Sequence, residues 1–257
     1  MAPLLARDEP TAFECIAGRD ASPFVLIADH AGCRVPRTLG NLGLTAADLA
    51  SHIAWDIGIE GTSRLLAQAL GACLIMQRYS RLVIDCNRPL ESPDSIAKRS
   101  AGIEIPSNLD LMPLDVKRRT ETIFRPYHDC IESELNRRGQ RALKTVFVAM
   151  HSFTPDFMGS RRRWHVGVLY QRDNRLAKHL LKALRSDSSL EVGDNQPYAV
   201  SDLSDYSIVW HGERRGMPHV EIEIRQDLIS DPEGQRIWAE RLQGILSGAA
   251  GALESGR

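Results

Sequence analysis

The run FVLIADH (residues 24–30) decides the fold of this chain, because five consecutive apolar residues end abruptly in an acid and a histidine. An unbroken apolar run of this length is typical of a central strand that is buried on both faces. Outward from it, short β-rich runs alternate with longer helical patterns, and no repeat or change of composition divides the chain. We therefore predict one domain over residues 1–257, built as a three-layer α/β/α fold with a mixed central sheet.

The other predicted elements follow from the same patterns. Thr45 and Asp48 form a capping box that opens a helical stretch. The segment 90–110 is rich in Pro, Ser and acidic residues and is expected to be a long loop over one face, of a kind that is often functional. Further strands are expected at residues 73–76, 82–86, 145–150, 165–170 and 220–224, and further helices from 57 to Gly71, 114–138 (ended by Gly139), 174–185 and 231–246.

The composition excludes several classes of protein. Apolar residues make up 43% and charged residues 25% of the chain, as in an average globular domain. The formal net charge of −1 gives no long-range attraction to nucleic acid or anionic lipid, and no apolar stretch is long enough to span a membrane. The five scattered cysteines, never in a C-x-x-C pair, favour a reducing cytoplasm. The basic cluster Arg161–Arg163 is expected to lie in a solvated loop.

Three of the apolar runs end in chemically capable residues. Ligands of open α/β sheets bind at the carboxyl ends of strands, so we expect these ends to converge on one crevice. Two of the ends carry His30 and His151, whose neutral nitrogens suit Zn²⁺, and we expect the two rings to share one ion. The sequence has no H-E-x-x-H motif, so a carboxylate ligand must come from elsewhere. Asp56 is the best candidate, although an Asp before a helix is also a routine N-cap.

The third strand end predicts a binding site for an anion. Asp85 is followed by Asn87 and Arg88, and Arg81 stands a few residues earlier. Guanidinium groups bind carboxylates through paired, charge-assisted hydrogen bonds, and an amide adds an orienting contact. The alternative is that Asp85 and Arg88 pair with each other to hold a turn. The excess of arginine over that pairing favours an anionic substrate.

The run HVEIEIR (residues 219–225) alternates strictly, so that Glu221, Glu223 and Arg225 share one strand face. Two carboxylates on one face of a central strand are costly to bury without a role. A general base that deprotonates water on a metal is such a role, and Glu223 is the preferred residue. The competing interpretation is an exposed face on which Glu pairs with Arg.

Two further histidines complete the polar residues of interest. His165 follows a tryptophan at a strand start, and His211 lies in a glycine-containing loop. Either would serve as a substrate contact or support a ligand. The alternative for each is a surface residue without a role.

Six motifs follow one another along the chain: Asp29-His30-Ala-Gly with Pro36, Trp55-Asp56, Ser80-Arg81-x5-Asn87-Arg88, Met150-His151-Ser152-Phe153, Trp164-His165-x-Gly167 and Glu223-Ile-Arg225. Taken in order, these motifs resemble those of the N-formylglutamate amidohydrolase family, over about residues 22 to 245. The family is distantly similar to zinc carboxypeptidases and aspartoacylase-type deacylases, which implies a phosphorylase/hydrolase-like fold.

The resemblance implies an enzyme that hydrolyses the amide bond of a small anionic N-acyl amino acid. The leading substrate is N-formyl-L-glutamate, which would give formate and glutamate in amino-acid catabolism, and the enzyme would act as a monomer or homodimer. The family pattern departs at Cys33, where a Glu ligand three residues after His30 would stand. The resemblance implies that His30 and His151 bind zinc, that Arg81, Asn87 and Arg88 bind the substrate carboxylate, and that Glu223 transfers the proton. We infer Asp56 as the third zinc ligand. We also assign His165 and His211 to substrate binding, and Arg81 to stabilisation of the oxyanion.

Other hypotheses remain at this point. The same site would act on longer peptides, as a carboxypeptidase or peptidoglycan-type amidase, if the loop 90–110 left an open groove. A chain without metal would be a carboxylate-binding protein. A thiol nucleophile at Cys33 or Cys86 is disfavoured, because neither has a visible electropositive, His-paired setting.

Overall fold

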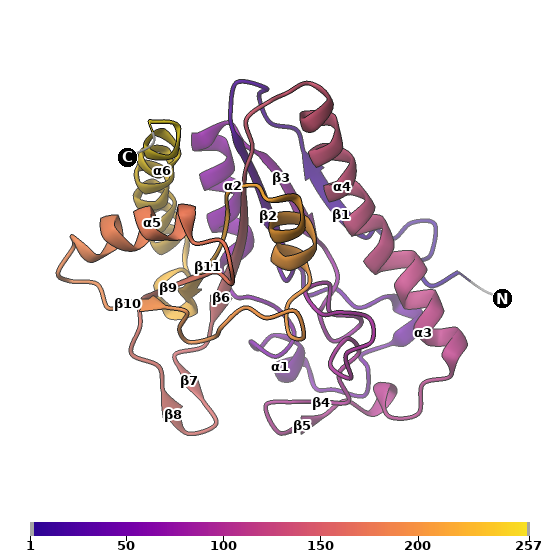
Figure 1. The fold of residues 1–257 in the computed structure, drawn as a ribbon. Coiled ribbons are helices and arrows are strands. Elements are labelled where there is room, and N and C mark those ends of the chain that lie inside the picture. The colour runs from indigo at the N-terminus through magenta and orange to yellow at the C-terminus, as the bar shows by residue number, and fades with distance from the viewer. Residues whose placement is uncertain (1–2, 256–257) are drawn as a thin grey trace.

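The computed structural model describes residues 3–255 and has the predicted three layers around a mixed sheet (Figure 1). The seven strands lie in the order β1-β3-β2-β6-β11-β9-β10. The inner strands β3, β2, β6 and β11 are parallel, whereas β1 and β9 are antiparallel to β3 and β11. The strands are β1 (Phe13–Ile16), β2 (Phe24–Ala28), β3 (Cys73–Gln77), β6 (Val146–Phe153), β9 (Val166–Leu169), β10 (Val192–Asp194) and β11 (His219–Arg225); two short hairpins comprise β4 (Arg99–Ser100) with β5 (Ile103–Glu104), and β7 (Asp156–Phe157) with β8 (Ser160–Arg161).

Helices cover both faces of the sheet (Figure 1). In β2, Leu26 and Ala28 face one core, whereas Val25 and Ile27 face the other, which explains its unbroken apolar run. Helices α2, α5 and α6 close the first core, and α4 closes the second. The helices are α1 (Ala46–Leu49), α2 (Ile59–Leu70), α3 (Pro113–Arg119), α4 (Arg125–Gln140), α5 (Arg175–Arg185) and α6 (Pro232–Glu254), with π turns at Thr120–Phe124 and Ile208–Gly212 and 3-10 turns at Arg37–Leu39, Pro106–Asn108, Glu213–Arg215 and Gln226–Leu228.

The predicted strand at residues 82–86 is wrong, although Leu82 and Val83 are buried in the core as expected. The backbone there forms turns whose carbonyl groups bond to side chains instead of a neighbouring strand. Asn108 Nδ2 donates to the Leu82 oxygen at 2.9 Å, and Arg119 Nη1 donates to the Val83 oxygen at 2.9 Å. Because these long polar side chains satisfy the buried carbonyl groups, the apolar segment 82–86 is buried in the core without pairing to a neighbouring β-strand.

The predicted helix 114–138 is present but longer and interrupted. Helical backbone runs from Pro113 to Gln140, and a π turn separates α3 from α4. Pro126 lies in the first turn of α4, where its missing N–H removes a donor from the regular ladder. Gly139 lies within the last turn of α4 instead of ending it.

Other predicted elements agree within a few residues, with one shift that matters for the site. β6 extends to Phe153, so His151 and Ser152 lie inside the strand instead of after it. β1 and β10 were not predicted, and α6 continues to Glu254. The loop 90–110 is irregular, as expected, apart from the β4–β5 hairpin and one 3-10 turn. Among the described residues, no helix is both long and apolar enough to cross a membrane.

Candidate active site

The carboxyl ends of β2, β6 and β11 meet at a cavity of about 340 Å³. The parallel register places Ile27 of β2 beside Ala149, and His151 of β6 beside Glu223. Residues from all three predicted strand ends therefore line one cavity, although the segment 82–86 is not a strand. The cavity is lined by His30, Asp56, Arg81, Asn87, Arg88, His151, Ser152, Phe157, Tyr198, Ala199, Ser204, Asp205, Glu221 and Glu223, which include every predicted site residue except His165 and His211.

His30, Asp56 and His151 form a compact, buried group at the base of this cavity. One ligand atom of each lies within 4.8 Å of the other two. Asp56 Oδ2 is 3.6 Å from His30 Nδ1 and 3.0 Å from His151 Nδ1. The expected approach of the two imidazoles is confirmed. Two nitrogens and one carboxylate oxygen are a donor set that Zn²⁺ accepts in catalytic sites.

Asp56 is not the N-cap of the helix that follows it. α2 begins at Ile59 and its N-cap is Gly58, in the left-handed conformation. The Asp56 carboxylate instead points to the cavity, where Oδ2 accepts a hydrogen bond from the Ser152 backbone N–H at 3.1 Å and Oδ1 accepts one from Arg81. These contacts hold Oδ2 beside both imidazoles.

Each imidazole has a second carboxylate on its far side. His30 Nε2 lies 2.7 Å from Asp85 Oδ1, and His151 Nε2 lies 3.2 Å from Asp29 Oδ2. An imidazole whose Nε2–H donates to a carboxylate, as the distance from His30 to Asp85 allows, keeps its Nδ1 deprotonated and available as a ligand. Both nitrogens that face Asp56 are Nδ1, so the arrangement suits a shared cation.

The charges around the group also suit a cation. Burial alone would lower the pKa of His151, but Glu221, Asp29 and Glu223 outweigh it and raise that pKa to about 9. Burial, with the charge of Arg81, lowers the pKa of His30 to about 4. His30 Nδ1 is buried without a hydrogen-bond partner. The His30 imidazole thus presents a free lone pair on Nδ1. The surrounding carboxylates favour positive charge between the two imidazoles.

Glu221 and Glu223 extend from β11 into the cavity and are both buried, so the exposed-face interpretation of this strand is wrong. Val220, Ile222 and Ile224 face the α6 side, as the alternation predicts. Burial raises the pKa of Glu221 to about 8 and also raises that of Glu223.

The residues expected to bind a carboxylate lie along one wall of the cavity, and each has a structural bond as well. Arg81 donates to Asp56 through Nη2, while its buried Nε has no partner. Arg88 donates through Nη1 to the Ser204 carbonyl. Asn87 accepts through Oδ1 from the backbone N–H groups of residues 206 and 207, at 3.1 and 3.0 Å. Asp85 bonds to His30 instead of forming the turn-holding pair with Arg88.

His165 and His211 do not join the other predicted site residues. His165 Nδ1 accepts from the Glu191 backbone N–H at 2.9 Å, near the paired strands β9 and β10. His211 is fully buried, and its Nε2 lies 3.0 Å from His128 Nδ1. Both rings are occupied by contacts within the fold.

Three residues near the cavity were missed from the sequence. Arg162 is buried, with its guanidinium 4.5 Å from the Phe157 ring and 4.7 Å from the Tyr198 ring, so it is not part of a solvated cluster. Its Nη1 also donates to the Tyr198 hydroxyl at 2.7 Å. The aromatic residues before and after the basic cluster were the available signal. However, Arg162 and its partner Tyr198 are 36 positions apart, so the sequence does not reveal that they meet.

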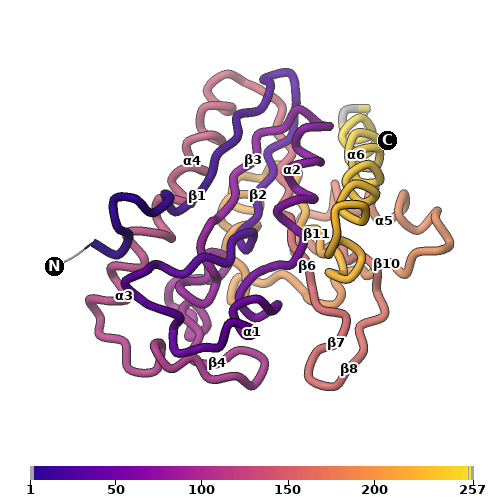
Figure 2. Tube along the Cα trace, turned by 180° about the vertical axis from the view of Figure 1, so that it is seen from behind, coloured from indigo at the N-terminus to yellow at the C-terminus, as the bar shows by residue number. Residues whose placement is uncertain are grey.

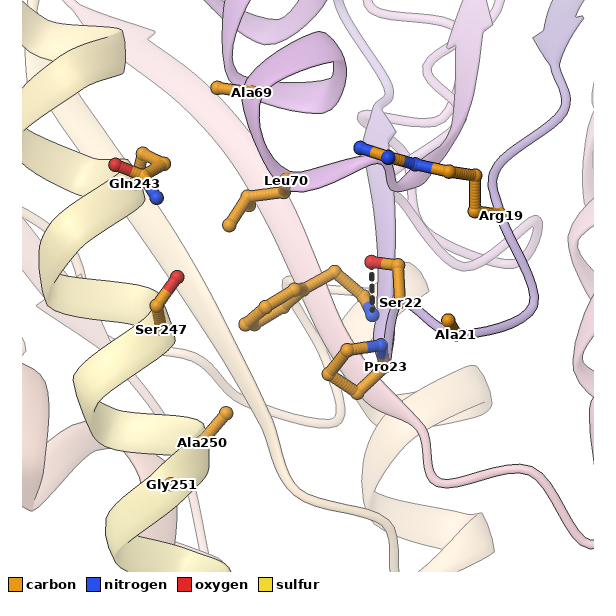
Figure 3. A pocket seen from close by; sticks show the side chains of 11 residues that line it. Arg19, Ala21, Ser22, Pro23, Ala69, Leu70, Gln243, Ser247, Ala250 and Gly251 are labelled. Carbon is orange, nitrogen blue, oxygen red and sulfur yellow. Dashed lines mark hydrogen bonds between the residues drawn. The ribbon is translucent and has the colours of Figure 1, made fainter.

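A second cavity, of about 400 Å³, lies at the opposite end of β2 (Figure 3). α2 supplies Leu70, and α6 supplies Gln243 and Ser247 across from it. Arg19 is the one charged residue among those that line it. Without a group of ligating or proton-transferring side chains in that lining, this cavity is not a candidate for catalysis.

Comparisons with known proteins agree with the geometry. Residues 22–230 match the family described as N-formylglutamate amidohydrolase. N-formylglutamate deformylase from Pseudomonas putida is 35% identical over 125 residues, and this match covers 45% of the chain and 46% of that protein, so it spans about half of the relative.

Solved structures show the same fold. The gene product Atu2144 from Agrobacterium tumefaciens has a TM-score of 0.94 and 35% identity, over 98% of this chain and 99% of that chain. N-formylglutamate amidohydrolase from Ralstonia eutropha JMP134 has a TM-score of 0.69 at 18% identity, over 96% and 100% of the two chains, which is a likeness of fold. Because the family match covers most of the sequence and runs through every residue of the cavity from His30 to Glu223, the chain belongs to the N-formylglutamate amidohydrolase family.

Proposed function

We propose that this chain is a metal-dependent amidohydrolase that converts N-formyl-L-glutamate to formate and glutamate. The observation that carries the proposal is the buried group of His30, Asp56 and His151, next to two glutamates and two arginines in one cavity. The ligand set is complete for a catalytic zinc site, which uses three protein ligands and keeps one position open. A divalent ion bound there would supply Lewis acidity, which acidifies water and polarises a carbonyl group.

The chain's own residues would move the proton. Glu223 pairs with His151 in the β6–β11 register, so its carboxylate is carried at the level of the ligand group. We assign it as the base that accepts a proton from the attacking water and returns the proton to the leaving amine nitrogen. Arg81 has a buried Nε–H without a partner, and this donor would stabilise the negative charge that develops on the carbonyl oxygen.

Arg88 would bind a substrate carboxylate and so set which end of the substrate faces the ligand group. Its anchoring through Nη1 to Ser204 leaves other N–H groups of a guanidinium that carries five. Asn87 would hold this wall in place through Oδ1 and offer its Nδ2, which is 3.5 Å from Asp205 Oδ1. A cavity with two arginines fits a small anionic N-acyl amino acid.

The size of the cavity favours this substrate over a longer peptide. Its volume of about 340 Å³ is at the lower end of the usual range for ligand sites. The exposed aromatic Tyr198 and the half-buried Phe157 are part of its lining. A thiol mechanism through Cys86 has no support, because burial raises the pKa of this thiol well above its usual range and its sulfur accepts from Gln77.

The test is a product assay combined with metal analysis of protein purified without chelators. We expect formate and glutamate from N-formyl-L-glutamate, loss of activity on chelation, and recovery when zinc is returned. N-acetyl-L-glutamate and a panel of dipeptides serve as competing substrates. Faster hydrolysis of a dipeptide would favour the peptidase alternative. Purified protein that holds no divalent metal and hydrolyses none of these compounds would favour a carboxylate-binding protein.

A further inference from the structure

The serine that begins the π turn at Ile208–Gly212 does not use its side chain to cap that turn. Ser207 is the N-cap residue and is fully buried, yet its hydroxyl accepts no hydrogen bond from the N–H groups that follow, as a capping serine usually does. The hydroxyl instead donates to Asp29 Oδ1 at 2.6 Å, across 178 positions of the sequence. The Ser207 side chain therefore supports the Asp29 carboxylate and not its own turn.

Asp29 lies between Ser207 and one of the proposed metal ligands. Its Oδ2 is 3.2 Å from His151 Nε2, and both atoms are buried without a hydrogen bond to any other described residue. Because Oδ1 is held by the Ser207 hydroxyl, the carboxylate cannot rotate freely, and Oδ2 stays against the imidazole. His151 Nδ1, on the other side of the ring, is 3.0 Å from Asp56 Oδ2. The position of Asp29 thus helps to set the direction in which the Nδ1 lone pair points.

The support of the second imidazole is joined to the same network. His30 Nε2 lies 2.7 Å from Asp85 Oδ1, and this oxygen also accepts from the Asn87 backbone N–H at 2.8 Å. The Asn87 side chain in turn accepts through Oδ1 from the Ser207 backbone N–H at 3.0 Å. Asn87 and Ser207, which we call the bridge, therefore connect the aspartate behind one imidazole with the aspartate behind the other.

The π turn is fixed to the segment around Asn87 at both of its ends. Two backbone N–H groups just before the turn donate to Asn87 Oδ1. At the other end, His211 Nε2 lies 3.0 Å from His128 Nδ1, and His128 Nε2 lies 2.9 Å from the Cys86 carbonyl oxygen. The apolar residues of the turn pack in the core that α4 covers, on the near side of the sheet in Figure 1 and on the far side in Figure 2. These contacts keep the bridge in one arrangement.

We propose that the two bridge residues are positioning residues, which hold both imidazoles of the proposed metal site through the aspartates behind them. The inference rests on the proposed function, because it takes these imidazoles as ligands of a zinc ion. The bridge also reaches the wall proposed to bind the substrate carboxylate, since Asn87 lines the cavity. The same two residues would therefore connect the position of the carboxylate with the position of the ion.

The alternative is that the Ser207 hydroxyl only satisfies a buried carboxylate oxygen. Loss of that hydrogen bond would then lower the free energy of unfolding and leave the metal affinity unchanged. A positioning role has a different consequence. An imidazole that must be reoriented when the ion binds loses part of the binding free energy, so the metal affinity itself falls. Zinc affinity and stability, measured on the same variant, therefore distinguish the two roles.

The test measures the zinc affinity of the full-length protein by competition with a chelator, with zinc alone and no substrate. Ser207→Ala should lower this affinity about tenfold, and Ser207→Thr, which keeps a hydroxyl, should restore most of it. Ser63→Ala is the matched control, because Ser63 of α2 is equally buried and its Oγ has no hydrogen-bond partner among the described residues. If Ser207→Ala bound zinc as tightly as the unaltered protein, with only its stability reduced, the proposal would be overturned.

A second pair of variants tests Asn87, whose proposed contact with the substrate would by itself affect substrate binding only. Asn87→Ala should lower the zinc affinity about tenfold in the absence of substrate, because the Ser207 backbone loses its acceptor. Arg88→Met, in the same wall, should raise KM for N-formyl-L-glutamate without lowering the zinc affinity. An Asn87→Ala protein with a raised KM and full zinc affinity would show that Asn87 does not hold the ligands.

A measurement on the metal-free protein separates this proposal from the proposed function. In NMR spectra of the imidazole nitrogens, the His151 signals should shift in Ser207→Ala but not in Ser63→Ala, because Asp29 is no longer held against the ring. If the unaltered protein bound no zinc and these signals still shifted, the proposed metal site would be wrong and the positioning of His151 would stand. Unshifted His151 signals in a protein that binds zinc would overturn the positioning role.

Discussion

Asp29 and Asp85 lie beside the imidazoles of the proposed metal ligands His151 and His30, on the side away from Asp56. Neither is among the residues that line the cavity, yet each lies against the Nε2 of one histidine. Such carboxylates fix the orientation and the protonated nitrogen of a ligating imidazole. Their contribution should therefore appear in metal affinity more than in substrate binding.

The first prediction concerns Asp85→Asn, which keeps the shape of the side chain and removes its charge. We expect the affinity for zinc to fall by about 10- to 100-fold, because His30 loses the carboxylate that orients it. Competition with a chelator of known affinity measures the change. Asp94→Asn is the matched control, since Asp94 is exposed in the same segment. Equal zinc affinities for the two variants would show that Asp85 has no part in holding the ligand.

The second prediction separates the two glutamates of β11. Glu223→Gln should lower kcat by about 10²- to 10⁴-fold with the metal content intact, because the amide cannot accept the proton. Glu221→Gln should do much less, since Glu221 pairs with Ala149, two residues before the position of His151 in the β6–β11 register. Steady-state kinetics and metal analysis of both variants give the answer. The reverse order of damage would make Glu221 the base.

The sequence predicted individual residues well where an apolar run marked a strand end. His30 and His151 stood out because each interrupts such a run, and strand ends of a parallel sheet meet at one edge. Asp85 could not be assigned, because its partner His30 is 55 positions away. Arg162 looked solvated in the sequence because three adjacent arginines cannot reveal that one of them contacts the rings of Phe157 in β7 and Tyr198 after β10.

At the scale of elements, the β7–β8 hairpin forms a wall of the cavity and is fastened by Arg162. The guanidinium contacts Phe157 of this hairpin and Tyr198 of the segment after β10. Each cation–π contact of this kind stabilises by about 0.5 to 2 kcal/mol. The Phe157 ring also meets the His52 ring at a centroid distance of 6.5 Å, but Arg162 joins the hairpin to Tyr198 and should therefore control its position.

The third prediction is that Arg162→Met raises KM for N-formyl-L-glutamate by about 5- to 30-fold, which corresponds to a loss of one or two kcal/mol. Limited proteolysis within residues 156–161 should also become faster. Arg161→Met is the control, because Arg161 is exposed and its ion pair with Asp156 contributes little. If both variants kept the KM and the protease resistance of the unaltered protein, the hairpin would be held by other contacts.

Helices and strands were predictable where local pattern and burial coincide. α2 is one such case, because its apolar spacing ends at Gly71, which adopts the left-handed conformation of a C-cap. The segment 82–86 shows the limit, since Asn108 and Arg119 satisfy its buried carbonyls from outside the run. A window of sequence contains the apolar residues but not the distant donors. The helix predicted over 114–138 is observed over 113–140 with a π turn, which the apolar spacing did not indicate.

At the scale of the whole molecule, stability should depend on two buried histidines outside the cavity. His128 and His211 stack with ring centroids 5.2 Å apart, and His128 Nε2 lies 2.9 Å from the Cys86 carbonyl oxygen. Burial lowers the pKa of His128 to about 4 and that of His211 to about 2, with Asp29 opposing the shift in both and Arg215 adding to it for His211. Both rings are therefore neutral in the folded protein at pH 7.

The fourth prediction follows from the difference between the pKa values of these histidines in the folded and in the unfolded chain. In the unfolded chain a histidine has a pKa near 6.5, so below that pH the unfolded state binds more protons than the folded state. The free energy of unfolding should therefore fall as the pH drops from about 6.5 towards 4, by on the order of 2 kcal/mol per histidine at pH 5. Denaturant titrations at several pH values measure the slope.

The substitution His211→Asn should make this slope shallower, because it removes one of the groups that take up a proton on unfolding. His179→Asn, in the half-exposed part of α5, is the control and should leave the slope unchanged. A slope that is the same in all three proteins would mean that other groups govern acid unfolding.

The pairing of β2 with β6 also determines when the sheet can form during synthesis of the chain. Residue 24 pairs with residue 146, and the base candidate Glu223 arrives on β11 later still. While the ribosome is still translating the middle of the protein, β2 has β3 on one side and an open edge on the other, which is a hazard for aggregation. A nascent chain halted between residues 153 and 219 would carry His30, Asp56 and His151 but no β11, so the proposed metal ligands are synthesised before the proposed base Glu223.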